Sequence, residues 1–205
     1  MDIAFLITAF ATLFVIVDPI GLMPMFVALT SGMSARERRA IAIRSCVVAI
    51  GILTLFGVLG EAVLGFVGIS MPAFRIAGGI LLFLTALDML FDRRAKRRED
   101  QSAEREDPSV FPLALPLIAG PGSIASMILL TSGDGGWETT IWVHVVMLAV
   151  IASVFLLFLT SGLVERILGQ TGINVVTRLL GMLLAALSVQ FVLDGIADVT
   201  SLVTV

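Results

Sequence analysis

The stretch VDPIGLMP, residues 17–24, lies inside the first long apolar run of the chain and contains an acid, two prolines and a glycine. Proline removes a hydrogen bond from the interior of a helix, yet it fits well as the first residue of a new helix. Asp18 is a residue type that caps helix N-termini well, and Pro19 directly follows it. We therefore predict that this run consists of two half-helices that meet near Asp18.

The composition is that of an integral membrane protein. Of the 205 residues, 58% are hydrophobic and 14% charged, whereas soluble domains are about 45 to 50% apolar and about 25% charged. A membrane helix needs about 20 apolar residues. The predicted spans are 4–29, 37–60, 71–91, 110–131, 139–162 and 175–197. The expected fold is thus an all-α membrane protein with six transmembrane helices.

Signals at the ends of these runs favour several helix starts. Ser34 and Glu37 have the spacing of a capping box, and Ser70 and Asn174 suit the first positions of the third and sixth helices. Basic residues follow the first, third and fifth runs, and basic loops face the cytoplasm. We therefore expect both termini outside the cytoplasm.

A charged linker, residues 92–109, divides the chain into two similar halves, residues 1–91 and 110–205. The third and sixth runs read RIAGGILLFLT from Arg75 and RLLGMLLAALS from Arg178, at an offset of 103 residues. Each half has three runs, so the second half must enter the membrane from the opposite side. The sequence therefore predicts an inverted-topology repeat, in which the first and fourth helices are discontinuous.

The second half has its own break, AGPGS, residues 119–123, close to the position that the offset gives for Pro19. Broken helices expose backbone groups that need a partner, and helix N-termini attract anions. Asp18 adds a negative group for an ammonium, a cation or a proton. The predicted substrate-binding residues are Asp18, Pro19, Gly21, Pro24, Gly120, Pro121, Gly122 and Ser123.

Other polar residues in the spans are candidates for ion coupling or for lining a cavity, together with Asp18. They are Arg75, Thr85, Asp88, Arg178, Ser188 and Gln190. All of them except Asp88 also have a structural alternative, since arginines extend toward the interface and Ser, Thr and Gln bond between helices. His144 is the only histidine, which excludes a metal site built from histidines, and we expect it to bond to a neighbouring helix. No metal or cofactor is predicted.

Two motifs together, DPIGLMPMF (residues 18–26) and PLIAGPGSIA (residues 116–125), resemble the MarC family of bacterial inner-membrane proteins. This family is grouped with the neutral amino acid transporters. The resemblance covers essentially the whole chain. It implies six spans in a three-plus-three inverted arrangement, a location in the inner membrane and, for some members, uptake of small neutral amino acids such as glycine and alanine.

The predicted function is secondary transport of glycine, alanine or serine by alternating access, coupled to H⁺ or Na⁺, and not catalysis. The expected partners are a small zwitterionic substrate, membrane lipids and further copies of the chain, but not nucleic acid. An exporter or channel for other metabolites or ions is the main alternative. Drug efflux and an intramembrane enzyme have weaker support. A thiol-electron conduit needs a cysteine in each half, and only Cys46 exists.

Overall fold

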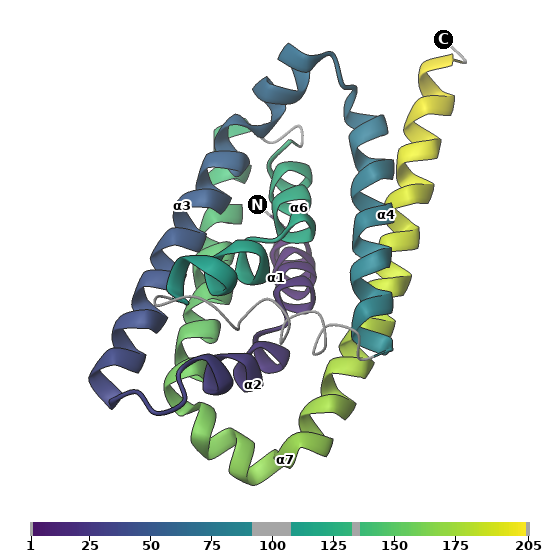
Figure 1. The fold of residues 1–205 in the computed structure, drawn as a ribbon. Helices are drawn as coiled ribbons and strands as arrows, with labels where there is room; N and C mark the ends of the chain where they lie inside the picture. The colour runs from purple at the N-terminus through teal and green to yellow at the C-terminus, as the bar shows by residue number, and fades with distance from the viewer. Residues whose placement is uncertain (1, 92–107, 133–135, 204–205) are drawn as a thin grey trace.

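The computed structural model describes residues 2–91, 108–132 and 136–203, and every regular element in these ranges is a helix (Figure 1). The predicted linker, residues 92–109, lies almost entirely outside the described residues. In chain order the helices are α1 (Ile3–Val17), α2 (Pro19–Leu29), α3 (Ala35–Val67), α4 (Met71–Leu90), η1 (Ser109–Ile118), α6 (Pro121–Thr131) and α7 (Gly136–Val203).

Local capping explains where the long helices start. The capping box at the start of α3 is confirmed: the Ser34 N–H donates to Glu37 Oε2 at 2.7 Å, and the Glu37 N–H donates to Ser34 Oγ at 3.3 Å. At the start of α4, Ser70 Oγ accepts a bond from the Ala73 N–H at 3.4 Å. These bonds satisfy backbone donors that a helix leaves open at its first turn.

The second predicted run, 37–60, is too short. Helix α3 has 33 residues and ends at Gly68, which adopts φ 79°. At 1.5 Å per residue it is about 50 Å long, against about 30 Å for the hydrocarbon core of a bilayer. The helix continues because Glu61 does not interrupt helical hydrogen bonding, whereas Gly68 takes the left-handed conformation that ends it.

The predicted start of the sixth helix at Asn174 is wrong. Asn174 lies inside α7, which is helical from Gly136 to Val203 apart from a bend at Gly169 (φ 61°, ψ 171°). Glycine adopts this conformation without the steric cost that a side chain would add, so the chain turns there without a separate loop. The two parts of α7 that could span a membrane are Gly136–Val164 and Thr171–Thr200.

Within the described residues, five helical segments are long and apolar enough to cross a membrane. The pair η1 and α6, bent by 55° between Ile118 and Pro121, makes a sixth if the two count as one span. Non-helical backbone inside η1, at Phe111 and Leu115, adds to the irregularity of this segment. The chain is therefore all-helical, with five or six candidate spans.

Figure 1 shows two long helix pairs on either side of the shorter helices. Helix α3 and the first part of α7 lie on one side, and α4 and the second part of α7 lie on the other, with α1, α2, η1 and α6 between them. Along the seam of α4 with α7, Gly195 faces Ile76 and Gly181 faces Met89. Because residue numbers rise on one helix as they fall on the other, the two helices are antiparallel.

Candidate functional site

Asp18 lies at the junction of α1 and α2 and belongs to the ends of both helices. Its backbone is left-handed (φ 53°, ψ 63°), and its N–H donates to the Phe14 carbonyl at 2.9 Å, which closes α1. Its carboxylate Oδ1 accepts a bond from the Gly21 N–H at 3.0 Å, which caps α2. The side chain is fully buried. The structure thus places an acid inside the protein at the positive end of a helix dipole.

Gly21 leaves room for this carboxylate. A Cβ atom at Gly21 would overlap the Asp18 carboxylate and would lie 3.0 Å from Thr177 Oγ1 on α7. Thr177 Oγ1 is buried and has no hydrogen-bond partner among the described residues. The glycine therefore allows Asp18 and Thr177 to approach the first turn of α2 together. Thr177 was not among the predicted site residues.

Pro24 lies inside α2 and is half-buried. Proline has no backbone N–H, so the helical bond to the carbonyl four residues earlier, that of Ile20, cannot form. Ile20 lies two residues after Asp18, in the first turn of α2. The first break therefore offers an acceptor oxygen in addition to the carboxylate.

The second break lies between η1 and α6. Gly120 is the N-cap of α6 and Pro121 is its first residue. Ser123 is buried, and its Oγ lies 2.7 Å from the Ile118 carbonyl and 3.0 Å from the Gly120 carbonyl. The hydroxyl thus donates to the Ile118 carbonyl at the break, whereas the Gly120 carbonyl already accepts the Ile124 N–H at 2.9 Å.

The two breaks lie side by side. A Cβ atom at Gly122 would be 3.3 Å from Ile16, near the end of α1, and 2.9 Å from Leu82 on α4. Thr85 Oγ1 on α4 is 4.0 Å from the same point. Ser126, one turn further along α6, is fully buried, and its hydroxyl has no hydrogen-bond partner among the described residues. The start of α6 therefore adjoins the end of α1, with the buried hydroxyl of Ser126 and the half-buried side chain of Thr85 close by.

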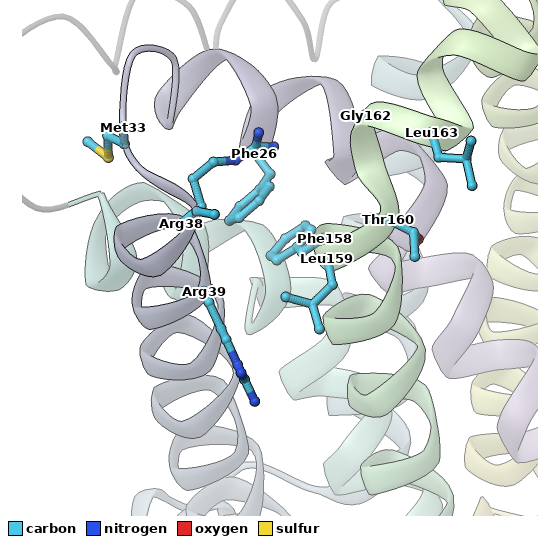
Figure 2. A pocket seen from close by; sticks show the side chains of 10 residues that line it. Phe26, Met33, Arg38, Arg39, Phe158, Leu159, Thr160, Gly162 and Leu163 are labelled. Carbon is cyan, nitrogen blue, oxygen red and sulfur yellow. The ribbon is translucent and has the colours of Figure 1, made fainter.

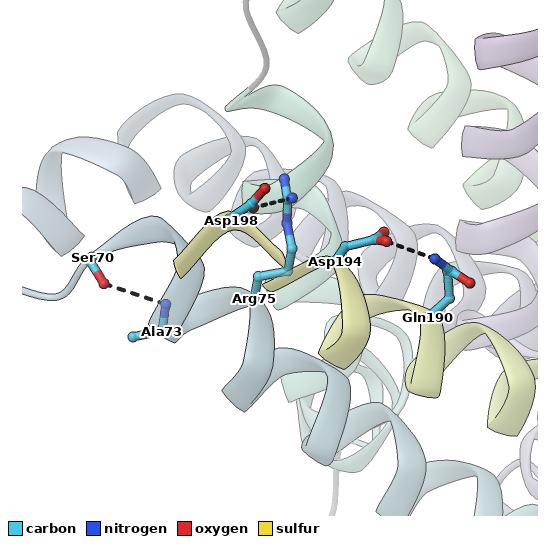
Figure 3. Close-up of polar contacts among 6 residues, drawn as sticks. All are labelled: Ser70, Ala73, Arg75, Gln190, Asp194 and Asp198. Carbon is cyan, nitrogen blue, oxygen red and sulfur yellow. Dashed lines mark hydrogen bonds and ion pairs between the residues drawn. The ribbon is translucent and has the colours of Figure 1, made fainter. Parts of the chain in front are cut away.

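Several predicted residues lie away from this junction or bond locally. Arg75 pairs with Asp198 at 2.6 Å, and Gln190 Nε2 donates to Asp194 Oδ1 at 2.6 Å; both pairs lie where α4 and α7 run together (Figure 3). Arg178 is exposed and Asp88 is half-buried. The Thr85 and Ser188 hydroxyls donate to carbonyls of their own helices.

The predicted interhelical bond of His144 is wrong. Its Nδ1 lies 2.7 Å from the carbonyl of Thr140, one turn earlier in the same helix. Its Nε2 is buried, and the ring lies against Gly57 of α3. The absence of a side chain at Gly57 admits the ring between the helices. The described residues contain no group of three or more His, Cys, Asp or Glu side chains arranged to hold a metal ion.

Comparison with known proteins identifies the family. The family model described as "MarC family integral membrane protein" matches residues 3–200. The chain belongs to the MarC family. It is therefore an integral, multi-pass membrane protein, in agreement with its long apolar helices.

Relatives of this MarC protein occur in both bacteria and archaea. A "UPF0056 membrane protein" of Archaeoglobus fulgidus is 40% identical over 206 residues, which cover 97% of each chain. "UPF0056 membrane protein YvbG" of Bacillus subtilis is 36% identical over the full length of both chains. "UPF0056 membrane protein YhcE" of Escherichia coli is 36% identical, with 93% of this chain and 91% of the relative covered. No solved structure matches this chain.

Proposed function

We propose that this protein is a secondary transporter of small neutral amino acids, of the glycine, alanine and serine class, in the bacterial inner membrane. The observation that carries the proposal is the buried carboxylate of Asp18 at the start of α2, beside the start of a second broken helix, α6. An acid inside the membrane is energetically costly, and such residues usually mark a functional site. Transporters commonly place their substrate sites where such broken helices meet.

The chemistry of the two breaks suits a zwitterion. The N-terminus of α6 carries partial positive charge and has no side-chain cap, so it can bind a substrate carboxylate, whereas at the start of α2 the Asp18 carboxylate already accepts the Gly21 N–H. The substrate amine can bond to the Asp18 carboxylate or to the Ile20 carbonyl. The buried hydroxyls of Thr177 and Ser126 supply further polar contacts. Asp18 is also the group best placed to carry a coupling proton or to bind Na⁺.

The repeat supplies the proposed mechanism of access. Gly79 of α4 faces the carbonyl of Ser188, and Gly181 of α7 faces the carbonyl of Ala86. The repeat offset of 103 residues carries Gly79 forward to position 182 and Ser188 back to position 85. These positions lie within one residue of Gly181 and Ala86, the second pair. This correspondence supports an inverted-topology repeat with a pseudo-twofold axis between the two helices. Rocking one repeat against the other would open the junction to each side of the membrane in turn.

Uptake by purified protein in liposomes tests this proposal. We expect labelled glycine, alanine or serine to accumulate when a proton or sodium gradient is imposed. Asp18→Asn should abolish accumulation, whereas the control Asp194→Asn, at a half-buried acid of α7 that bonds within its own helix, should retain it. Absence of gradient-dependent uptake of all three amino acids would disprove the proposal. Amino acid flux that does not depend on the proton or sodium gradient would instead indicate a channel.

A further inference from the structure

A cavity of about 580 Å³ lies between α2, the start of α3 and the end of the first part of α7. Figure 2 shows its lining, which includes two stacked phenylalanines and two arginines. The lining residues are Phe26, Met33, Ala35, Arg38, Arg39, Phe158, Leu159, Thr160, Gly162 and Leu163. None of these is a residue of the two breaks, so the cavity is separate from the proposed transport site.

The structure holds Arg38 in a fixed position. Its guanidinium donates from Nη2 to Ser161 Oγ at 3.1 Å and lies 5.6 Å from the centroid of the Phe26 ring. The Phe26 ring stacks on Phe158, with centroids 4.3 Å apart and an interplanar angle of 6°. An arginine has five N–H donors in a rigid plane, and the bond to Ser161 uses one of them. Arg38 is therefore pre-organised to bind a second acceptor.

The charged residues that line the cavity are positive. Arg39 contributes a second cation, whose side chain extends along α3 away from Arg38 (Figure 2). Among the residues that the structure describes, the lining contains no acidic side chain. Phosphate oxygens are the acceptors that arginine binds best, through paired charge-assisted bonds. The cavity is therefore complementary to an anionic phosphate group.

The apolar part of the lining favours a lipid over a free phosphate compound. Leu159 and Leu163 are 46% and 60% exposed, on a segment that is long and apolar enough to span a membrane. Arg38 and Arg39 lie in the first turns of α3, beside the end of the α7 span Gly136–Val164. Basic pockets between helix ends bind phospholipid head groups in this way. A soluble phosphate ester would gain nothing from the leucines.

We propose that this cavity binds the head group of an anionic glycerophospholipid. Arg38 binds the phosphate, Arg39 adds a second positive charge to the lining, and an acyl chain packs on Leu159 and Leu163. The site connects α2, α3 and α7, so an occupied site fixes the end of α2 against both long helices. This proposal does not depend on the transported solute or on whether transport takes place.

Native mass spectrometry of the purified full chain tests it. Phosphatidylglycerol and phosphatidylcholine with the same acyl chains are titrated into wild type, into Arg39→Gln and into the double variant Arg38→Gln with Arg39→Gln. We expect the double variant to bind phosphatidylglycerol about tenfold more weakly than wild type, because it loses hydrogen bonds from charged side chains to the phosphate. The affinity of Arg39→Gln should lie between those of wild type and the double variant, because this variant retains the Arg38 contacts with Ser161 and Phe26.

Controls separate this site from nonspecific attraction. Arg36→Gln removes a cation from the same helix turn outside the lining and should leave binding unchanged. Equal weakening by Arg36→Gln, or equal binding of phosphatidylcholine by wild type, would overturn the proposal. Displacement of the lipid by glycerol phosphate at equal concentration would also overturn it, because the occupant would then be a soluble phosphate ester.

Discussion

Asp18 combines a left-handed backbone, a helix cap and a buried carboxyl group at one residue. Only the charge is needed for a proton or an ammonium ion, whereas the cap is needed for α2 to start where it does. Asparagine keeps the cap and tolerates the left-handed backbone, but it has no charge. Alanine keeps neither the cap nor the charge. The two substitutions therefore separate folding from function.

We predict that Asp18→Asn melts within a few degrees of wild type in detergent and fails to transport. Asp18→Ala should be less stable by about 1 to 3 kcal/mol, since it loses both the cap and a residue suited to φ 53°. Thermal unfolding and liposome uptake, measured on the same preparations, check both statements. If Asp18→Asn transports as wild type does, Asp18 serves only as a cap.

The sequence predicted the residues of the breaks better than it predicted their neighbours. Capping depends on groups three residues apart, so Asp18 could be recognised as a cap of α2 from DPIG alone. Thr177 approaches Gly21 through tertiary packing, and it has no counterpart in the repeat comparison that would have indicated it. What indicates Thr177 is its buried hydroxyl, which has no hydrogen-bond partner among the described residues, and this can be seen only in the structure.

At the scale of elements, glycine lets the backbones of the antiparallel helices α4 and α7 approach each other closely. A Cβ atom at Gly79 would lie 2.8 Å from the Ser188 carbonyl oxygen and 3.1 Å from the backbone nitrogen of Val192. Backbone atoms cannot rotate away as a side chain can. Any side chain at this position must push the two helices apart.

We predict that Gly79→Ala lowers the free energy of unfolding by about 1 to 3 kcal/mol, as overpacked sites do. Gly51→Ala is the matched control. Gly51 also lies inside a helix, α3, but a Cβ atom there meets nothing within 4 Å. Its substitution should be neutral or stabilising by up to about 1 kcal/mol, through helix propensity. Thermal unfolding of both variants measures the difference, and equal destabilisation would contradict a close seam.

Helix starts were predicted correctly where the signal is a hydrogen bond within one turn, as at Ser34 and Ser70. The start predicted at Asn174 was wrong because asparagine can cap a helix, but no local signal ends the preceding helix directly before it. The turn occurs instead at Gly169, whose positive φ the sequence permits but does not require. His144 bonds within its own helix because Thr140 lies one turn before it.

For the whole molecule, the irregular segment formed by η1 and α6 decides the topology. If it crosses the membrane as one bent span, the chain has six spans and both termini lie on the same side. If it enters and leaves on one side, five spans remain and the termini lie on opposite sides. An inverted repeat of three spans requires the first arrangement.

We predict that both termini face away from the cytoplasm, as the basic residues after the first and third spans indicate. Alkaline phosphatase fused to either end should be active in intact cells, and green fluorescent protein at the same positions should remain dark. A fluorescent fusion at one end and an active phosphatase at the other would establish five spans and exclude the inverted repeat.

Our central claim is that the junction of the two breaks opens to each side of the membrane in turn. Thr177→Cys, combined with Cys46→Ala, places a single thiol beside Gly21 and Asp18. Membrane-impermeant maleimide is applied to right-side-out and to inside-out vesicles, with and without the transported amino acid. We predict labelling from both sides and slower labelling when the amino acid is bound. Labelling of a transport-competent protein from one side only, at a rate that the amino acid does not change, would contradict the claim.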